Sequence, residues 1–309
     1  MRRSVAIAVL AAIMTVTGAV AAVAFGDFGP WGDAEDIESF GPGADENFNT
    51  PDVEGCPFIS PDGKMFFIAS NRGGGLGGLD VWVSTRASEA EPWGEPVNVG
   101  APINSAANDF CPTIGRDGKT FFFASNRDGY CGTSPNADIY TTRFDSGLQV
   151  STVTHLGCQV NSGWDEHSPF PAQIPGEGPT LFYSSARPAN ESDTTTDHDL
   201  YHSPMHGGVY GAGVALSDIN TGANEGQPNV RRDGGELFFW SDRAGGEGGP
   251  DIYSSASLLM GEWGTPQNLG PDVNSGAGET RPSLSWDGTT LYFGSTRVGG
   301  QSDVYVVTR

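Results

Sequence analysis

The sequence has little positive charge. Its 309 residues include 16 lysines and arginines against 38 aspartates and glutamates, for a formal net charge of −22. Only two lysines occur, Lys64 and Lys119. Such a surface repels phosphate backbones and anionic headgroups, which argues against binding to nucleic acid or to a membrane surface. By charge, the natural partners are cations or basic protein surfaces.

Long apolar runs are absent after residue 25. Residues 5–23 are apolar or small, follow Arg2 and Arg3, and end at the small-x-small sequence of residues 22–24. This pattern predicts a signal peptide over residues 1–24 and an exported chain that is periplasmic, at the cell surface or secreted. An uncleaved anchor is the alternative, because the run is about the ~20 residues needed to span a bilayer.

Cysteine is scarce, and no CxxC pair occurs, which argues against a zinc knuckle or a redox motif. In an exported chain the four cysteines favour disulfides. Three connectivities are open, and pairing Cys131 with any of the others would pin a long loop in the second repeat. The disulfide candidates are Cys56, Cys111, Cys131 and Cys158.

Sustained helical periodicity is also absent, and a repeat with spacings of 54 to 59 residues takes its place. Each copy begins with Asn followed by Ser or Thr, has a carboxylate five positions later and a proline eight positions later. The asparagines are Asn49, Asn104, Asn161, Asn220 and Asn274. The carboxylates are Glu54, Asp109, Glu166, Glu225 and Glu279.

Each copy then reads as four strands, here called A to D. Strand A follows the proline, an Asp-Gly or Glu-Gly turn leads to an aromatic strand B ending in Ser-x-Arg, and strand C starts at an Asp. The arginines are Arg72, Arg127, Arg187, Arg243 and Arg297, and the aspartates are Asp80, Asp138, Asp199, Asp251 and Asp303. Strand D follows a Trp-Gly pair, as in residues 93–99. Four antiparallel strands per repeat predict the blade of a β-propeller.

The two ends of the chain predict how the ring closes. The last copy stops at Arg309 without a strand D, while residues 31–40 match the Trp-Gly segment of the other copies. We therefore predict an all-β, five-bladed β-propeller, closed by the N-terminal strand completing the last blade. It forms one domain over residues 25–309. Residues 25–50 hold the outer strand of the last blade, and the blades lie near residues 51–104, 105–161, 162–220, 221–274 and 275–309.

The repeat resembles the TolB-like (WD-like) β-propeller family. The resemblance rests on Ser60-Pro61-Asp62-Gly63-Lys64, on Ser-Asn-Arg at residues 70–72 and 125–127, and on Asp-Ile-Tyr at residues 138–140 and 251–253. The segment from Trp93 to Pro112 is similar to the propellers of envelope proteins fused to OmpA-like domains. This resemblance implies an extracytoplasmic interaction or scaffolding module. No OmpA-like domain follows Arg309, which puts cell-wall anchoring in doubt.

The repeated residues favour structural roles, since every blade has them. We expect each Ser-x-Arg arginine to pair with the strand C aspartate across the B–C hairpin. The five carboxylates before strand A are expected on the face of the B–C and D–A loops, near the channel mouth. There they are held by local backbone N–H groups, have raised pKa values, or bind a cation such as Ca²⁺; the first is favoured. No other cofactor is implied.

Departures from the repeat carry the functional signal. All five histidines lie between His155 and His206. His167 follows a repeated carboxylate and His198 precedes a repeated Asp, so both are expected at the channel mouth, beside Asp193 and Asp197. We interpret this cluster as a candidate ligand or metal site, with solvated surface histidines as the alternative.

Three functions fit these features. The favoured one is a non-catalytic, monomeric binding or scaffolding module that recognises an envelope or extracellular protein or glycan through its loop-rich face. The second is a glycoside hydrolase or other carbohydrate-active enzyme on a five-bladed propeller. A glycoside hydrolase needs carboxylates in distinct roles, whereas the acidic positions here are near-copies of one another. The third is a calcium-dependent structural protein.

Overall fold

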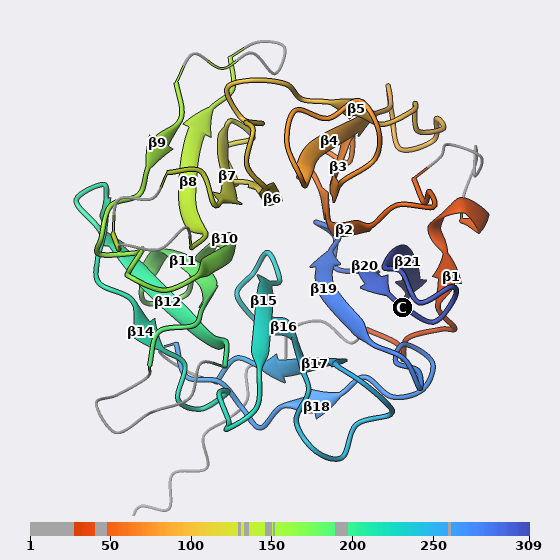
Figure 1. Cartoon of the computed structure of the whole chain (residues 1–309). Coiled ribbons are helices and arrows are strands. Elements are labelled where there is room, and N and C mark those ends of the chain that lie inside the picture. Colours follow the sequence, from red (N-terminus) through yellow and green to blue (C-terminus); the bar gives the residue numbers. More distant parts are fainter. Residues whose placement is uncertain are drawn as a thin grey trace, which may run out of the picture.

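Five antiparallel sheets are arranged around a central axis (Figure 1). This computed structural model describes residues 28–40, 48–128, 131–132, 136–145, 150, 152–188, 197–258 and 261–309. The predicted signal peptide lies outside the described residues. In the described part the helical element is one short 3₁₀ turn, η1 (Ile37–Ser39), and no helix there is long and apolar enough to cross a membrane.

Each sheet is one blade, and strands A to D follow one another from the axis outward. The first blade contains β2 (Glu54–Ile59), β3 (Met65–Ser70), β4 (Asp80–Thr85) and β5 (Val97–Asn98). The second contains β6 (Asp109–Ile114), β7 (Thr120–Ser125), β8 (Asp138–Arg143) and β9 (Thr154–His155). The third contains β10 (Glu166–Ile174), β11 (Gly178–Ser185), β12 (Asp199–His206), β13 (Val209–Tyr210) and β14 (Val214–Ala215). The fourth contains β15 (Glu225–Val230), β16 (Glu236–Ser241), β17 (Asp251–Ala256) and β18 (Gln267–Asn268). The fifth contains β19 (Glu279–Leu284), β20 (Thr290–Ser295), β21 (Asp303–Thr308) and β1 (Glu35–Asp36).

The predicted closure of the ring is confirmed. Strand β1 pairs antiparallel with β21, with Glu35 opposite Val306, so the start of the described chain completes the blade formed by its end. Asn49 strengthens the contact, because its side chain donates to the carbonyl of Val304 at 3.1 Å and accepts from the Val304 N–H at 2.7 Å. The five-bladed fold with four-stranded antiparallel blades is therefore established.

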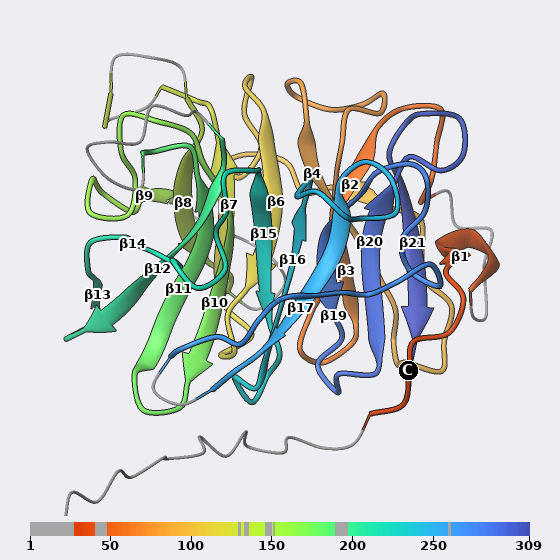
Figure 2. The same ribbon diagram turned by 90° about the horizontal axis from the view of Figure 1, so that it is seen from below.

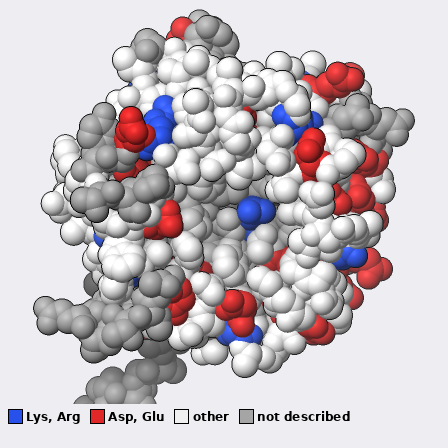
Figure 3. Space-filling model, in the orientation of Figure 1, with Lys and Arg blue, Asp and Glu red and all other residues white. Residues whose placement is uncertain are grey.

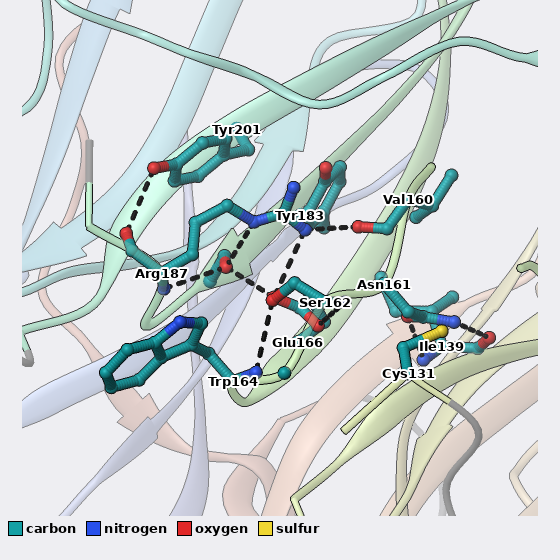
Figure 4. A network of polar contacts seen from close by, with 12 residues as sticks. Cys131, Ile139, Val160, Asn161, Ser162, Trp164, Glu166, Tyr183, Arg187 and Tyr201 are labelled. Atoms are coloured by element: carbon teal, nitrogen blue, oxygen red, sulfur yellow. Dashed lines mark hydrogen bonds and ion pairs between the residues drawn. The ribbon is translucent and has the colours of Figure 1, made fainter. Parts of the chain in front are cut away.

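The repeated asparagine makes this contact in every blade. Asn161 donates to the carbonyl of Ile139 at 3.1 Å and accepts from its N–H at 2.7 Å, linking the D–A connection to strand C (Figure 4). Asn104, Asn220 and Asn274 do the same to Val81, Leu200 and Ile252. The Asn therefore recurs because each blade needs both bonds to satisfy the backbone of its third strand.

The aromatic strands B form the packed core between blades. Their rings are buried on both sides of the sheet, so the strands read as continuous apolar runs rather than alternating ones. Trp263 lies 6.1 Å from Phe182 of the third blade, and Trp31 lies 6.0 Å from Phe238 of the fourth. These two tryptophans thus pack against the preceding blade, whereas Trp93 lies 5.6 Å from Phe66 of its own blade.

Strand D is shorter than predicted. The ladder in the first blade covers Val97–Asn98 instead of residues 93–99. Pro96 stands directly before it, and proline has no N–H to donate to a neighbouring strand. Pro266 occupies the same position before β18 in the fourth blade.

Two opposite faces result from this topology. Strands A and C begin, and strand B ends, at the face of the B–C and D–A loops, which is the upper edge in Figure 2. The tight A–B turns lie at the other face, the lower edge in the same view. We call these the loop face and the turn face.

Candidate functional site

The five carboxylates that begin strand A are fully buried and fully used within their own blades. Glu166 is 0% exposed and accepts hydrogen bonds from the N–H and the hydroxyl of Ser162 and from the hydroxyl of Ser185, each at 2.6 Å (Figure 4). Arg187 forms an ion pair with it at 3.1 Å. Burial raises the pKa of Glu166, and the Arg187 charge and these donors oppose that rise.

The same arrangement recurs in the other blades. Each carboxylate is 0% exposed, accepts from a Ser or Thr four positions earlier, and pairs with the arginine that ends strand B. The pairs are Glu54 with Arg72, Asp109 with Arg127, Glu225 with Arg243 and Glu279 with Arg297. This is the geometry of carboxylates held by local donors. Within the described residues, no group of three or more acidic, His or Cys side chains is placed to hold a metal ion.

The arginine pairing corrects the sequence expectation. The arginines pair with the strand A carboxylates, not with the aspartates Asp80, Asp138, Asp199, Asp251 and Asp303 that begin strand C. The reason is local: Arg187 donates through Nε to Ser185 and lies over Tyr201, which directs the guanidinium toward strand A. The strand C aspartates instead hold loops and strand D.

Asp251 and Asp303 show how the strand C aspartates hold neighbouring segments and how burial and nearby charge affect their pKa values. Asp251 accepts from the Glu247 N–H at 2.6 Å and from Asn268 of strand D at 2.9 Å. In the last blade, burial and the nearby charges of Asp36 and Glu54 raise the pKa of Asp303 to about 6. Completing this blade with an acidic N-terminal segment therefore concentrates negative charge at the joint.

Two positions after each buried carboxylate, the chain bulges toward the axis. The residue there has a left-handed backbone in all five blades, with φ between 48° and 61°, and the A–B register shifts at this point. Such backbones are uncommon in residues other than glycine and mark positions that the surrounding structure imposes. The five residues line a narrow axial cavity of about 30 Å³: Cys56, Cys111, Ser168, Gln227 and Arg281.

Both disulfides lie on the loop-face side. Cys56 and Cys111 are bonded to each other and join the first two blades at the axis. Cys131 is bonded to Cys158, so the loop after β7 is tied to the segment after β9. The sequence left three connectivities open, and the structure has Cys56–Cys111 with Cys131–Cys158. In this connectivity Cys131 fixes the long loop of the second blade. Two disulfides are consistent with folding in an oxidising, extracytoplasmic compartment.

Arg281 is the unusual member of the axial ring. Its Nε has no hydrogen-bond acceptor, its Nη1 makes one long bond of 3.4 Å to Ser302, and no carboxylate of the described residues lies within ion-pair distance. Burial lowers the pKa of its guanidinium. The side chain lies over Gly55, where a Cβ would approach Nη1 to 2.5 Å, so glycine there makes room for it. The buried Oε1 of Gln227 also has no partner in the described residues.

The predicted histidine pair is brought together beside this arginine. The ring centroids of His167 and His198 are 4.8 Å apart, and His167 Nδ1 lies 2.8 Å from the Ser168 hydroxyl. Burial, with the charges of His198 and Arg281, lowers the pKa of His167 to about 3. Burial also lowers the pKa of His198, although Asp165 and Asp197 act in the opposite direction. Both rings are therefore neutral at physiological pH. Asp193 lies outside the described residues.

The channel mouth therefore combines one cation with uncharged polar groups. Figure 3 shows a hollow at the centre of the loop face with a basic patch in it, uncharged surface around the patch, and acidic side chains toward the rim. Sequence reasoning found the histidines but missed Arg281 and Gln227. The signal was available, because the residue two positions after the carboxylate differs between copies that otherwise match.

Comparison with models of protein families and with curated proteins finds no match. Solved structures do match. A thermostable family-43 glycoside hydrolase has a TM-score of 0.55 at 13% identity, over 85% of this chain and 90% of that one. An endo-arabinase from Bacteroides thetaiotaomicron has a TM-score of 0.53 at 16% identity, over 88% and 95%. TolB from Acinetobacter baumannii has a TM-score of 0.50 at 14% identity, over 84% of this chain and 55% of that one. At these identities the likeness shows the fold alone. The fold is shared by TolB and by glycoside hydrolases, and no family is assigned.

Proposed function

We propose that this protein is an exported, non-catalytic recognition module that binds a carboxylate-bearing partner at the mouth of its channel. The observation that carries the proposal is Arg281, a half-buried guanidinium with no carboxylate partner among the described residues. A buried or half-buried charge is stabilised when it is paired, and an incoming carboxylate would supply both the charge and the missing acceptor.

The distribution of charge favours a protein as the partner. Acidic side chains lie toward much of the rim of the loop face, and the hollow at its centre is uncharged apart from one basic patch (Figure 3). The complementary surface is basic with one protruding acidic side chain or a chain terminus. Such complementarity speeds encounter and suppresses wrong partners. A uronic acid residue of a glycan offers the same carboxylate and is the alternative occupant.

A glycoside hydrolase is the second candidate, and its support is the fold shared with family-43 enzymes. Hydrolysis of a glycosidic bond uses two carboxyl groups that flank the sugar in a cavity. The axial cavity described here is lined by no Asp or Glu, and the repeated carboxylates are 0% exposed and bonded within their blades. The geometry therefore favours binding over hydrolysis.

The test uses the mature protein, immobilised and exposed to envelope extract and culture medium of the source cells. Wild type is compared with Arg281→Gln and with a matched control, Arg143→Gln, which changes an exposed arginine of the turn face. We expect a defined partner to bind wild type and the control equally and to bind Arg281→Gln at least tenfold more weakly, the effect of losing one charge-assisted bond.

Two parallel measurements separate the alternatives. Oligouronides are titrated against neutral oligosaccharides of equal length, and aryl arabinofuranosides and xylosides are incubated with the protein. Partner capture that is indifferent to Arg281→Gln would contradict the proposal. Turnover of an aryl glycoside would replace it with the hydrolase.

A further inference from the structure

The turn face collects the basic side chains that neither pair with the strand A carboxylates nor lie at the axis. Fourteen lysines and arginines follow residue 27. Five arginines pair with the strand A carboxylates and Arg281 lies at the axis. The other eight flank the ends of strands A and C or the start of strand B, which all meet at this face (Figure 2). They are Lys64, Arg86, Arg116, Lys119, Arg143, Arg231, Arg232 and Arg309.

Two of these arginines converge on one indole. The Cζ atoms of Arg116 and Arg232 lie 5.5 Å and 5.3 Å from the ring centroid of Trp286. The three residues come from A–B turns of the second, fourth and fifth blades, so three separate blades build the cluster. Stacking on an aromatic ring orients a guanidinium but leaves its edge N–H groups free to donate.

The neighbouring carboxylates are already engaged. Asp233 pairs with Arg231 at 2.9 Å and accepts from the Gly235 N–H, and Asp287 accepts from Ser285 and Thr289. Within the described residues, Arg116 and Arg232 have no carboxylate within ion-pair distance. Both are exposed, so their charges are accessible to a ligand.

Space for a ligand lies beside this cluster. A cavity of about 340 Å³ is lined by Arg116, Arg231, Arg232 and Trp286, among others. A second, of about 250 Å³, shares Arg232 and Trp286 and is also lined by Glu89, Ser285 and Thr290. The first lies within the usual size of small-ligand pockets, and the room and hydroxyl lining suit a sugar rather than a bare ion.

We infer that the turn face holds a second binding site, in which Arg116 and Arg232 take a sulfate or phosphate ester group of a glycan beside Trp286. Two guanidinium groups match the several acceptor oxygens of such an ester, which carries one negative charge as a sulfate and up to two as a phosphate. The hydroxyl and aromatic groups of the two cavities would contact the sugar. The site is independent of the channel mouth.

The experiment is calorimetric titration of the mature protein at low ionic strength. The probes are inorganic sulfate, inorganic phosphate, a sulfated oligosaccharide, a sugar phosphate and a desulfated oligosaccharide. The proteins are wild type, Arg116→Gln with Arg232→Gln, Trp286→Phe, and two controls. Arg143→Gln removes an arginine of the same face that already pairs with Asp117 at 2.8 Å, and Arg281→Gln disables the channel mouth.

We expect the sulfated or phosphorylated sugar to bind wild type and both controls alike, and to bind the double variant about a hundredfold more weakly, at about tenfold per arginine. The desulfated sugar should bind weakly to every protein. A preference between the two esters assigns the source of the group. Equal binding to wild type and double variant would overturn the inference, as would binding of none of the charged probes. If only Arg281→Gln abolished binding of the charged sugar, the anion would be bound at the channel mouth instead.

Discussion

Acidification will destabilise this protein through His167. The folded pKa is lowered to about 3 from an ordinary value of 6.5. Between pH 6.5 and about pH 3 the His167 side chain is therefore protonated in the unfolded chain but neutral in the folded protein. The free energy of unfolding consequently falls as the pH falls. At pH 5 the pH lies about 1.5 units below the unfolded-state pKa of His167. At about 1.4 kcal/mol per unit, the loss of stability amounts to about 2 kcal/mol.

The perturbation that isolates this effect is His167→Gln, which keeps a polar side chain and cannot titrate. Urea unfolding followed by tryptophan fluorescence at pH 7, 6 and 5 gives the free energy of unfolding of both proteins. The difference between them matters, because other groups contribute to the wild-type curve. The raised pKa of Asp303, about 6, acts in the opposite sense, since its folded form gains a proton as the pH falls toward 3.8.

Between pH 7 and pH 5, wild type should lose about 2 kcal/mol more than His167→Gln does. His206→Gln is the matched control, because His206 is exposed at the end of β12, and it should follow wild type. Parallel pH curves for wild type and His167→Gln would refute the reasoning. They would mean that the imidazole of His167 is solvated and that the two histidines are not held neutral at the channel mouth.

Three further outcomes test the framework of the blades. Glu225→Gln should lower the free energy of unfolding in urea by about 3 kcal/mol, because it leaves Arg243 without its charge partner. Asn49→Ala removes two hydrogen bonds to Val304, so it should lower the free energy of unfolding by about 2 kcal/mol and speed amide hydrogen exchange in β21. Asn104→Ala should lower the free energy of unfolding by as much without speeding exchange in β21. Cys131→Ser opens a link between residues 27 apart and should lower stability by about 3.5 kcal/mol on the chain-entropy model, measured in the same urea assay.

The blades could be predicted from sequence because every local signal repeats. The Asn, the carboxylate and the proline stand at fixed offsets, and the structure gives the Asn, the carboxylate and the Ser-x-Arg arginine each a polar contact that holds the blade. The partner of the arginine could not be predicted the same way. Two acidic positions were available to it in every copy, and the choice depends on how Ser185 and Tyr201 orient one guanidinium in space.

The axial ring was harder to predict for a different reason. Its residues share an offset of two from the repeated carboxylate and a backbone conformation, but not a residue type, so the sequence marks Cys56, Ser168 and Arg281 as equivalent without showing that they line the axis. His167 was found because histidine is rare in this chain and its neighbour Glu166 is one of the repeated residues. Arg281 was missed because it is one of 16 lysines and arginines and its position holds other residue types in the other copies.

The left-handed bulge explains how one fold can hold different chemistry at its axis. Cys, Ser, Gln and Arg all adopt φ between 48° and 61° there, so the backbone does not depend on which side chain it presents. Each such residue costs about 1 kcal/mol or more, which the bonds of the buried carboxylate two positions earlier can offset. The disulfide between Cys56 and Cys111 fixes two of the five positions. Under the proposed function, recognition falls to the other three, and of these only Arg281 has a charge.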